Sequence, residues 1–469
     1  MGGYGNNMFQ KKSTPRQGLN VIIIGCGKVG ATLVEQLSRE GHDITIIDQN
    51  QDLVQELSGL YDIMGIIGNG ASYSVQMEAG ITSADLLIAV TASDELNLLC
   101  CTIAKQVGDC ATIARVRTPD YSKEANYLRE RLGLALIINP ELMAARETAT
   151  ILSLPTALEI NAFAHGQAEM IKFKVPKDNY IDGMTVAELG QSHTTNIHIC
   201  AIERNNTVYI PSGNFQIAAG DMISFITSRK VAKAFFKDIG YKNTQVKSAM
   251  IIGGGTAAYY LAQQLISIGV SVKIIEQDRK RCESLSILLP KAIIINGDGT
   301  DQSLLEEEGI RQTEAFIPLT GIDEENVMLT LYARQVSSAK VVTKINRITF
   351  KNVLNTLDLG SVVYPKYMAA EAIIAYVRAK NASQHSEVET LYHMFDSKAE
   401  AVEFIVKEHS EITDIPLKDL QLKDNLLVSL ICRNGTIIFP SGADCIKVGD
   451  TVMIVTTHSG FSSIQDILK

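Results

Sequence analysis

The sequence lacks several features, and each absence excludes a class of protein. It has no cluster of Lys and Arg, and its formal net charge is -9. A nucleic-acid partner is therefore not expected, because phosphate neutralisation needs clustered basic side chains. The longest apolar runs, such as residues 86–90 and 134–138, are far shorter than the roughly 20 residues that span a bilayer. We expect no membrane-spanning segment.

Signals for metal binding and for secretion are also missing. The eight cysteines have neither CxxC nor Cys/His spacing, which argues against a structural zinc and for a reducing compartment. Residues 1–18 contain no apolar core of the kind that a signal peptide carries, so export is not indicated. We expect these residues to form a flexible tail, followed by three or four domains at about 150 residues each.

The chain is organised around the stretch Leu19–Asn50. Apolar residues 21–24 predict a short buried strand, and residues 44–47 predict a second strand that leads to Asp48. Between the strands lie a glycine-rich turn and apolar residues at helical spacing, which indicate a helix that ends at Gly41. This order is typical of a nucleotide-binding βαβ unit.

The turn itself, GCGKVG at residues 25–30, predicts a phosphate site. Gly25 permits the tight turn, Gly27 lets the backbone approach a pyrophosphate, and Gly30 lets helix and strand pack closely. The helix start offers unpaired N–H groups and the positive end of the helix dipole to the phosphates. Asp48 lies where an acidic residue accepts hydrogen bonds from ribose hydroxyls, and it would repel the 2′-phosphate of NADP.

Strands and helices continue to alternate after this unit. Further strands are predicted at residues 63–67, 86–90, 111–116 and 135–138. The alternation predicts an α/β lobe with a parallel, doubly wound sheet. From about residue 159, short strands and turns predict a small α+β lobe, in which no nucleophile, carboxylate pair or metal-ligand cluster is apparent. Asp221, which follows a glycine in this lobe, is expected to be a turn residue, as is Asp450 further on.

The whole pattern then returns with an offset of about 230 residues. The turn GGGTAA at residues 253–258 repeats the phosphate turn, with Ala258 in place of the third glycine, and Glu276 takes the place of the acidic residue. In the small lobes, RNNTVYIPSG at 204–213 and RNGTIIFPSG at 433–442 share six of ten residues. The chain is therefore predicted to be a tandem duplication of a two-lobe unit.

This arrangement resembles the family of peripheral TrkA subunits of bacterial Trk-type potassium uptake systems, which contain two regulator-of-potassium-conductance (RCK) units. The resemblance covers about residue 19 to the C-terminus. It rests on the lobe order, the GxGxxG turn, the GNGA and GDGT loops at 68–71 and 297–300, and the TxxDExN loops at 91–97 and 320–326. The predicted parts are a flexible tail (1–18), a first Rossmann or RCK N-lobe (19–155), a first RCK C-lobe (159–236), a linker (237–246), a second Rossmann lobe (247–380) and a second C-lobe (398–469).

The resemblance implies a regulatory subunit that is not an enzyme. Such subunits are cytoplasmic and peripheral on the inner face of the cell membrane. They bind NAD(H) or ATP/ADP and gate a membrane potassium-translocating subunit of the TrkH type. Two units per chain suit a homotetrameric gating ring. The helices expected at 141–152 and 366–377 would cross to a neighbouring lobe, or else pack within their own.

The motifs and the resemblance together give a set of candidate nucleotide contacts, with no catalytic residue and no metal ligand. In the first lobe they are Gly25, Cys26, Gly27, Lys28, Val29, Gly30, Asp48, Asn69, Gly70, Ala71, Thr91, Asp94, Arg115 and Arg117. In the second lobe they are Gly253, Gly255, Thr256, Ala257, Glu276, Asp298, Gly299, Thr320 and Lys344. Lys28 is alternatively a solvated lysine. Asp94 and Asn97 either line the cleft or stand at a helix start where the dipole favours them.

The second half departs from the pattern of the first. Lys344 and Asn346 stand where the first half has Arg115 and Arg117. Loss of planar, bidentate phosphate donors should weaken a triphosphate more than an adenosine-ribose contact. We therefore expect the first site to bind better than the second, and whether both bind the same nucleotide stays open.

Two other functions compete with this interpretation. An NAD-dependent oxidoreductase would need a substrate lobe that supplies a general acid or base beside the nicotinamide. The segment after each Rossmann lobe is short and offers no convincing His, Lys or Tyr cluster. A nucleotide-free scaffold would require both glycine turns to be vestigial. We rank the nucleotide-sensing regulator first, the oxidoreductase second and the scaffold third.

Overall fold

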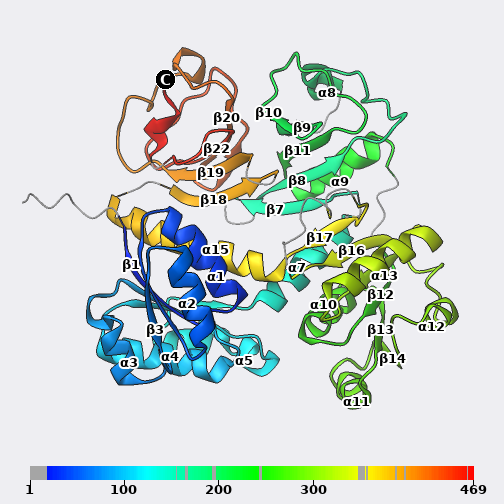
Figure 1. Ribbon diagram of the computed structural model, residues 1–469. Helices are drawn as coiled ribbons and strands as arrows, with labels where there is room; N and C mark the ends of the chain where they lie inside the picture. The colour runs from blue at the N-terminus through cyan, green and yellow to red at the C-terminus, as the bar shows by residue number, and fades with distance from the viewer. Residues whose placement is uncertain are drawn as a thin grey trace, which may run out of the picture. The chain divides into compact units, whose positions relative to one another are not determined.

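The structure is a computed structural model that describes residues 18–154, 156–163, 167–192, 197–241, 246–346, 354, 357–385, 388–395, 398–461 and 463–469 (Figure 1). The predicted tail therefore lies outside the described residues except for Gly18, as does part of the predicted linker (242–245). The chain divides into two compact units, of which the second begins at Pro140.

The first unit holds one α/β lobe, drawn in blue and cyan in Figure 1. Its six-stranded sheet is parallel throughout, in the order β3-β2-β1-β4-β5-β6. The strands are β1 (Asn20–Ile24), β2 (Asp43–Asp48), β3 (Met64–Ile67), β4 (Leu86–Ala89), β5 (Ala111–Arg115) and β6 (Leu136–Ile138). The helices are α1 (Lys28–Arg39), α2 (Gln51–Leu60), α3 (Tyr73–Glu78), the 3-10 turn η1 (Ile81–Ser83), α4 (Asp94–Val107), α5 (Pro119–Lys123) and α6 (Ala125–Leu132). The predicted doubly wound sheet is confirmed.

Side chains in the sequence explain where these helices begin. The side chain of Asn50 caps α2 by accepting backbone N–H groups of its first turn, and Ser93 caps α4 in the same way. The start of α1 is different, because its N-cap is Gly27, which has no side chain with which to cap. The first N–H groups of α1 are thus left for another partner.

The second unit contains a copy of this lobe. Its sheet is also parallel and six-stranded, in the order β14-β13-β12-β15-β16-β17. The strands are β12 (Ser248–Ile252), β13 (Ser271–Glu276), β14 (Ile293–Asn296), β15 (Ala315–Pro318), β16 (Lys340–Lys344) and β17 (Ser361–Val363). The helices include α10 (Thr256–Ser267), α11 (Arg279–Leu288), α12 (Gln302–Glu307), α13 (Asp323–Val336) and α15 (Pro365–His385). The predicted duplication is confirmed.

Two small lobes with antiparallel sheets complete the second unit. The first has the strand order β10-β9-β11-β8-β7 and consists of β7 (Glu159–Phe163), β8 (Ala168–Lys174), α8 (Val186–Ser192), β9 (His198–Arg204), β10 (Thr207–Tyr209), β11 (Met222–Thr227) and α9 (Arg229–Asp238). The second has the order β18-β19-β22-β20-β21 and consists of β18 (Val388–Met394), β19 (Ala399–Ile405), η3 (Leu417–Asp419), β20 (Leu426–Arg433), β21 (Thr436–Ile438), β22 (Thr451–Thr456) and η4 (Ile464–Ile467). Strand β18 begins before residue 398, the expected start of the second small lobe.

The two small sheets share one apolar core. This core joins Met170, Cys200 and Ile226 of the first sheet to Met394, Leu430 and Met453 of the second. Strands β9 and β20, which are equivalent strands of the repeat, are also in contact. Equivalent parts of the two small lobes therefore lie next to each other.

Asp221 and Asp450 do more than form turns. Both carboxylates are only 1% exposed. Asp221 accepts hydrogen bonds from Nε and a terminal nitrogen of Arg204, both at 2.7 Å, and Asp450 makes the same bidentate contact with Arg433. The expectation of plain turn residues is thus incomplete, because each buried carboxylate is compensated by a planar guanidinium donor.

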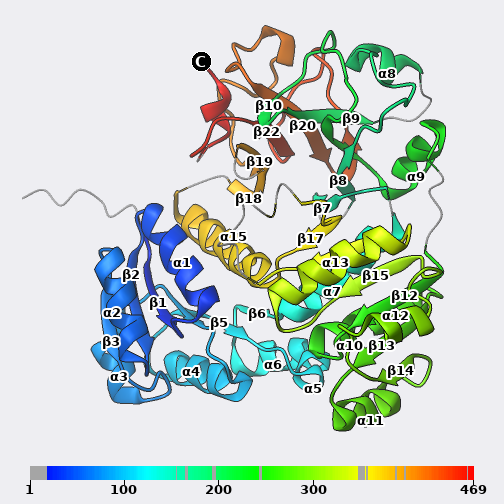
Figure 2. The ribbon, with the colours of Figure 1, turned by 45° about the vertical axis from the view of Figure 1, so that its right-hand side comes forward.

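Helix α7 (Pro140–Ser153) follows directly on β6 in the sequence but belongs to the second unit. It packs against α10, and Ala145, Ala149 and Leu152 join the core that contains Ala258 and Leu261. Of the two options predicted for this helix, crossing to the neighbouring lobe is the correct one. Its counterpart α15, the long yellow helix in Figure 2, contacts α7 and β18.

None of the helices within the described part of the chain has the length and apolar composition needed to cross a lipid bilayer.

The packing of α7 leads to a prediction of how the stability of the fold depends on pH. Burial, with the nearby carboxylates of Glu159 and Glu371, raises the pKa of Glu147 to about 8. Between pH 4.5 and 8 the folded chain keeps a proton that the unfolded chain has released, so stability falls as the pH rises through this window. We expect Glu147→Gln to raise the thermal unfolding midpoint above pH 8 and to change it little below pH 4.5.

Circular dichroism melts of both chains across this pH range measure the effect. Glu307→Gln, at an exposed position of α12, is the matched control and should follow the wild type at every pH. Equal pH profiles for Glu147→Gln and the wild type would contradict a partly buried Glu147 with a raised pKa.

Candidate functional site

The glycine turn between β1 and α1 forms the floor of the candidate site. Gly25 has φ of +103°, and a Cβ there would lie 2.9 Å from the backbone nitrogen of Thr91. A Cβ on Gly30 would lie 2.0 Å from the carbonyl oxygen of Gly25. These two glycines are therefore required by the fold itself.

Gly27 has a different environment from its neighbours. Its φ and ψ of -64° and -173° suit any residue, and a Cβ placed on it would have no atom within 4 Å. The fold does not need a glycine there. Gly255, the N-cap of α10 in the second lobe, has the same backbone conformation and the same open space. Both positions leave room for a group to approach the uncapped start of the helix.

The acidic residue after the second strand is bound to the turn in both lobes. Asp48 accepts hydrogen bonds from the N–H groups of Cys26 at 2.6 Å and Asn50 at 2.8 Å. Glu276 accepts from Gly254 at 2.6 Å and Asp278 at 2.8 Å. The carboxylate thus holds the loop and stands at its edge. Burial and the Asp48 charge raise the pKa of the Cys26 thiol to about 12, so this cysteine is not a nucleophile.

The loop after the third strand approaches the turn closely in both lobes. A Cβ on Gly70 would lie 2.2 Å from a methyl carbon of Ile24, and one on Gly299 would lie 2.2 Å from a methyl carbon of Ile252. Asn69 accepts from the N–H of Ala71 at 3.0 Å. In the second lobe Asp298 accepts from both the N–H and the hydroxyl of Thr300, which lowers its pKa.

The ends of β4 and β5 are tied together by a buried amide. Asn97 is fully buried; its Oδ1 accepts from the N–H of Thr91 at 2.8 Å, and its Nδ2 donates to the carbonyl of Arg115 at 2.9 Å. Asn326 makes the same two contacts, with Thr320 and Lys344. Asn97 thus has a role that was not among the two considered for it, because its side chain holds the ends of β4 and β5 together.

Asp94 has a comparable role one turn earlier. It is 3% exposed and accepts from the N–H groups of Arg117 and Thr118 at 2.8 and 2.7 Å. Arg115 and Arg117 donate to the carbonyl oxygens of Thr91 and Ala92. Both guanidinium groups therefore lie at the carboxyl ends of the strands, the edge at which open α/β sheets bind ligands.

At this edge the second lobe has a lysine in place of the arginines, and helix α7 packs over it. The Nζ of Lys344 donates to the carbonyl of Leu319 at 2.9 Å, and burial lowers its pKa while the carboxylates of Asp323 and Glu141 oppose that shift. Ala144, Ala145 and Thr148 of α7 line a small cavity with Lys344, Leu319, Ala257, Leu261 and Val363. Helix α7 thus lies over the strand ends of the second lobe.

Two participants in the second site do not follow from the sequence. One is α7 itself, whose contact with α10 depends on tertiary packing. The other is Arg281, whose Nε donates to the carbonyl of Gly254 at 2.6 Å. The reach of this side chain back to the glycine turn has no sequence signature. Of the predicted contacts, Lys28 is exposed, whereas the side chain of Val29 is buried in the core.

Comparisons with known proteins agree with this architecture. The TrkA-N domain matches residues 21–140 and 249–365, and the TrkA-C domain matches residues 170–240 and 401–469. The Trk system potassium uptake protein TrkA of Haemophilus influenzae is 31% identical over 444 residues, which cover 93% of this chain and 95% of that protein. TrkA homolog 2 of Methanosarcina mazei is 28% identical over 459 residues, covering 96% of this chain and 100% of that protein.

Solved structures resemble the fold at lower sequence identity. A GsuK channel bound to NAD has a TM-score of 0.62 and 17% identity, and the match covers 95% of this chain and 77% of that one. The GsuK RCK domain has a TM-score of 0.62 and 17% identity, with coverage of 95% and 93%. At this identity the likeness concerns the arrangement of lobes.

The glycines of the turn make a prediction that separates fold from ligand. We expect Gly27→Ala to change the free energy of unfolding by no more than about 0.5 kcal/mol, because its backbone is relaxed and its Cβ meets nothing. Gly70→Ala should cost about 1–3 kcal/mol, because its Cβ would overlap Ile24. Urea unfolding of both variants provides the comparison, and equal losses would show that Gly27 also serves the fold.

Proposed function

The chain belongs to the TrkA family of Trk-system potassium uptake proteins, and from this membership we propose that it is a nucleotide-sensing regulatory subunit. In this proposal each Rossmann lobe binds an adenine nucleotide, NAD(H) or ATP/ADP, and the chain gates a membrane potassium-translocating subunit of the TrkH type. It carries out no reaction itself. It acts by binding a nucleotide more tightly in one conformation than in another, because a ligand shifts a conformational equilibrium only when it binds one state more tightly.

One observation carries this proposal. In both lobes an uncapped helix start, an open glycine N-cap and an acidic residue at the end of the next strand lie together. Unpaired N–H groups and the positive end of the helix dipole suit a pyrophosphate. The carboxylate of Asp48 or Glu276 stands at the loop edge, where ribose hydroxyls would donate to it. The solved structure of GsuK with NAD supports the choice of NAD among the ligands to test.

The two sites are proposed to differ in ligand preference. Arg115 and Arg117 at the first site are planar, permanently charged donors, and both now donate to loop carbonyls that phosphate oxygens would replace. At the second site Lys344 offers one desolvated ammonium. The first site should therefore favour nucleotides with more phosphate charge, and the second should depend more on the adenosine-ribose contact with Glu276.

Assembly and coupling complete the proposal. Two units per chain suit a homotetrameric ring with eight Rossmann lobes, peripheral on the cytoplasmic face of the membrane. Helix α7 is the proposed link between the halves, because it continues from the first lobe and lies over the strand ends of the second. A nucleotide that enters the second site would contact α7 and so alter a helix attached to the first.

Isothermal titration of the full chain with NAD, NADH, ATP and ADP tests the proposal. We expect two binding sites per chain, of which Gly27→Ala removes the first and Gly255→Ala the second, because each new methyl group occupies the space open to phosphate. The ratio of ATP affinity to NAD affinity should be higher in Gly255→Ala, which retains the first site, than in Gly27→Ala, which retains the second. Arg115→Lys should lower that ratio about tenfold, the equivalent of one charged hydrogen bond.

The matched control is Gly59→Ala in α2, where a new Cβ also meets open space but lies away from the turn. It should bind as the wild type does. An absence of binding to all four nucleotides would sink the proposal in favour of a scaffold. Steady turnover of NADH with a substrate would instead favour the oxidoreductase alternative.

A further inference from the structure

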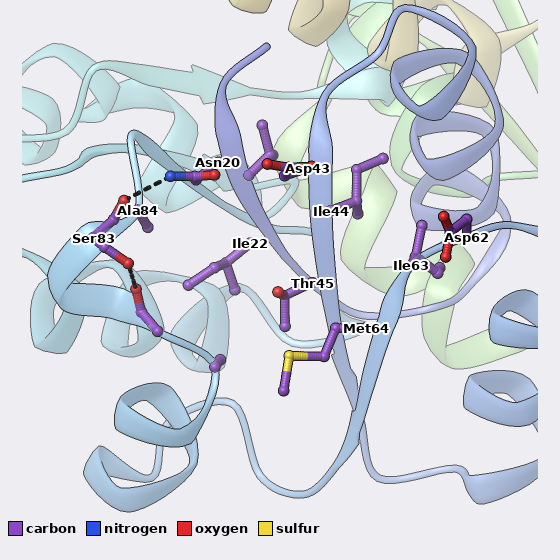
Figure 3. A pocket seen from close by; sticks show the side chains of 13 residues that line it. Asn20, Ile22, Asp43, Ile44, Thr45, Asp62, Ile63, Met64, Ser83 and Ala84 are labelled. Carbon is purple, nitrogen blue, oxygen red and sulfur yellow. Dashed lines mark hydrogen bonds between the residues drawn. The ribbon is translucent and has the colours of Figure 1, made fainter. Parts of the chain in front are cut away.

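The first Rossmann lobe has a cavity away from the glycine turn (Figure 3). Its volume is about 530 Å³, which falls in the range of about 300–1,000 Å³ typical of ligand sites. It is lined by the first residues of β1, β2 and β3. The glycine turn and Asp48 lie at the opposite, carboxyl ends of these strands, so the cavity is separate from the nucleotide site.

The register of the sheet defines the floor of this cavity. Ile22, Thr45 and Met64 are neighbours across β1, β2 and β3, so their side chains share one face. Asn20 and Asp43 form the next row. In Figure 3 the side-chain amide of Asn20 points toward Ser83 on the opposite side of the cavity. Its Nδ2 donates a hydrogen bond to the carbonyl oxygen of Ser83 at 3.1 Å.

The charged side chains among the described residues of the lining are all acidic. Asp43 and Asp62 are both among the 13 lining residues, and none of the 13 is Lys, Arg or His. The cavity therefore offers carboxylates and backbone carbonyls at its edge and apolar side chains at its floor. A ligand with a positive charge and an apolar stem matches this lining.

The duplicated lobe shows how this space can be filled. The equivalent row of the second sheet is Met250, Lys273 and Ile293, so a lysine stands where the first lobe has Thr45. Its Nζ donates to both the carbonyl and the carboxylate of Glu308, each at 2.7 Å. The second lobe thus places its own alkylammonium group over this part of the sheet.

The partner of that lysine has also changed between the lobes. Glu308 precedes Gly309, which has φ of +87°, and Ala79 precedes Gly80, which has φ of +79°. The two turns correspond, so the lysine and its carboxylate are both absent from the first lobe. At the rim, the first lobe carries an acidic residue where the second carries a basic one. Asp62, two residues before Met64, corresponds to Lys291, two residues before Ile293.

We propose that this cavity binds a small alkylammonium ligand of the diamine or polyamine class. One ammonium group takes the place that Lys273 Nζ has in the second lobe and donates to the carbonyl of Ala79. The methylene stem lies over Ile22 and Met64, and a further ammonium group lies near Asp43 and Asp62. The first lobe thereby takes from solution a cation that the second lobe supplies from its own chain.

Titration of the full chain with spermidine at low ionic strength tests this assignment. We expect one saturable site per chain. The double variant Thr45→Lys/Ala79→Glu, which copies the ion pair of the second lobe, should abolish this binding. The reciprocal variant Lys273→Thr/Glu308→Ala should add a second equivalent of bound spermidine, because it opens the corresponding space.

Two further measurements distinguish a specific site from general attraction to an acidic surface. Asp43→Asn, at an exposed position that carries little folding risk, should weaken binding about two- to fivefold, as expected for a partly screened charge pair. Magnesium ions, which lack an alkyl stem, should not displace bound spermidine when the two are present at the same total concentration of positive charge. Spermidine binding that is displaced by magnesium and is unchanged in all three variants would be surface electrostatics and would overturn the assignment, as would an absence of binding. Nucleotide titration of each variant shows separately whether the nucleotide sites are intact.

Discussion

The starts of α1, and of α10 in the second copy, have no side-chain cap, and the proposed binding function depends on this feature. A helix start needs a capping partner, and helices α2, α4 and α11 find one in the side chains of Asn50, Ser93 and Asp278. At α1 and α10 the N-cap is a glycine in relaxed, open backbone. The surrounding residues hold this opening in place: a carboxylate fixes the loop, and a buried asparagine fixes the strand ends beside it.

Duplication has kept this framework and changed the charges around it. The hydrogen bonds of Asp48 and Glu276, and those of Asn97 and Asn326, are the same in both lobes. The cations at the strand ends differ, as does the edge of the sheet where Lys273 pairs with Glu308. Positions that hold the backbone are thus repeated, whereas the charged positions at the strand ends and at the sheet edge have diverged, in keeping with the proposal that the two halves differ in ligand preference.

Much of the fold could be predicted because apolar periodicity and glycine turns are local signals. The βαβ order is visible within a short window of sequence, and the duplication is visible because the same motifs return further along the chain. Strands β7 and β18 could not be predicted individually, because each is defined by its backbone pairing with the strand that follows it, β8 or β19. The glycine turn lies between β1 and α1 as expected, and the nucleotide contacts of its residues stay a prediction. Arg281 could not be placed in advance, since its contact with Gly254 follows from tertiary packing. For α7 the sequence left two options open, and its packing against α10 decides between them.

Potassium flux through the cognate membrane subunit in proteoliposomes, with this chain added at saturating concentration, is the sharpest test of the proposed sensing role. We predict that flux differs between NAD-type and ATP-type nucleotides with the wild-type chain. Gly27→Ala, which stays folded but lacks the open space at the helix start, should lose the part of that difference due to the first site. A nucleotide response that is the same in the variant, or no response in either chain, would contradict a sensing role for the helix start.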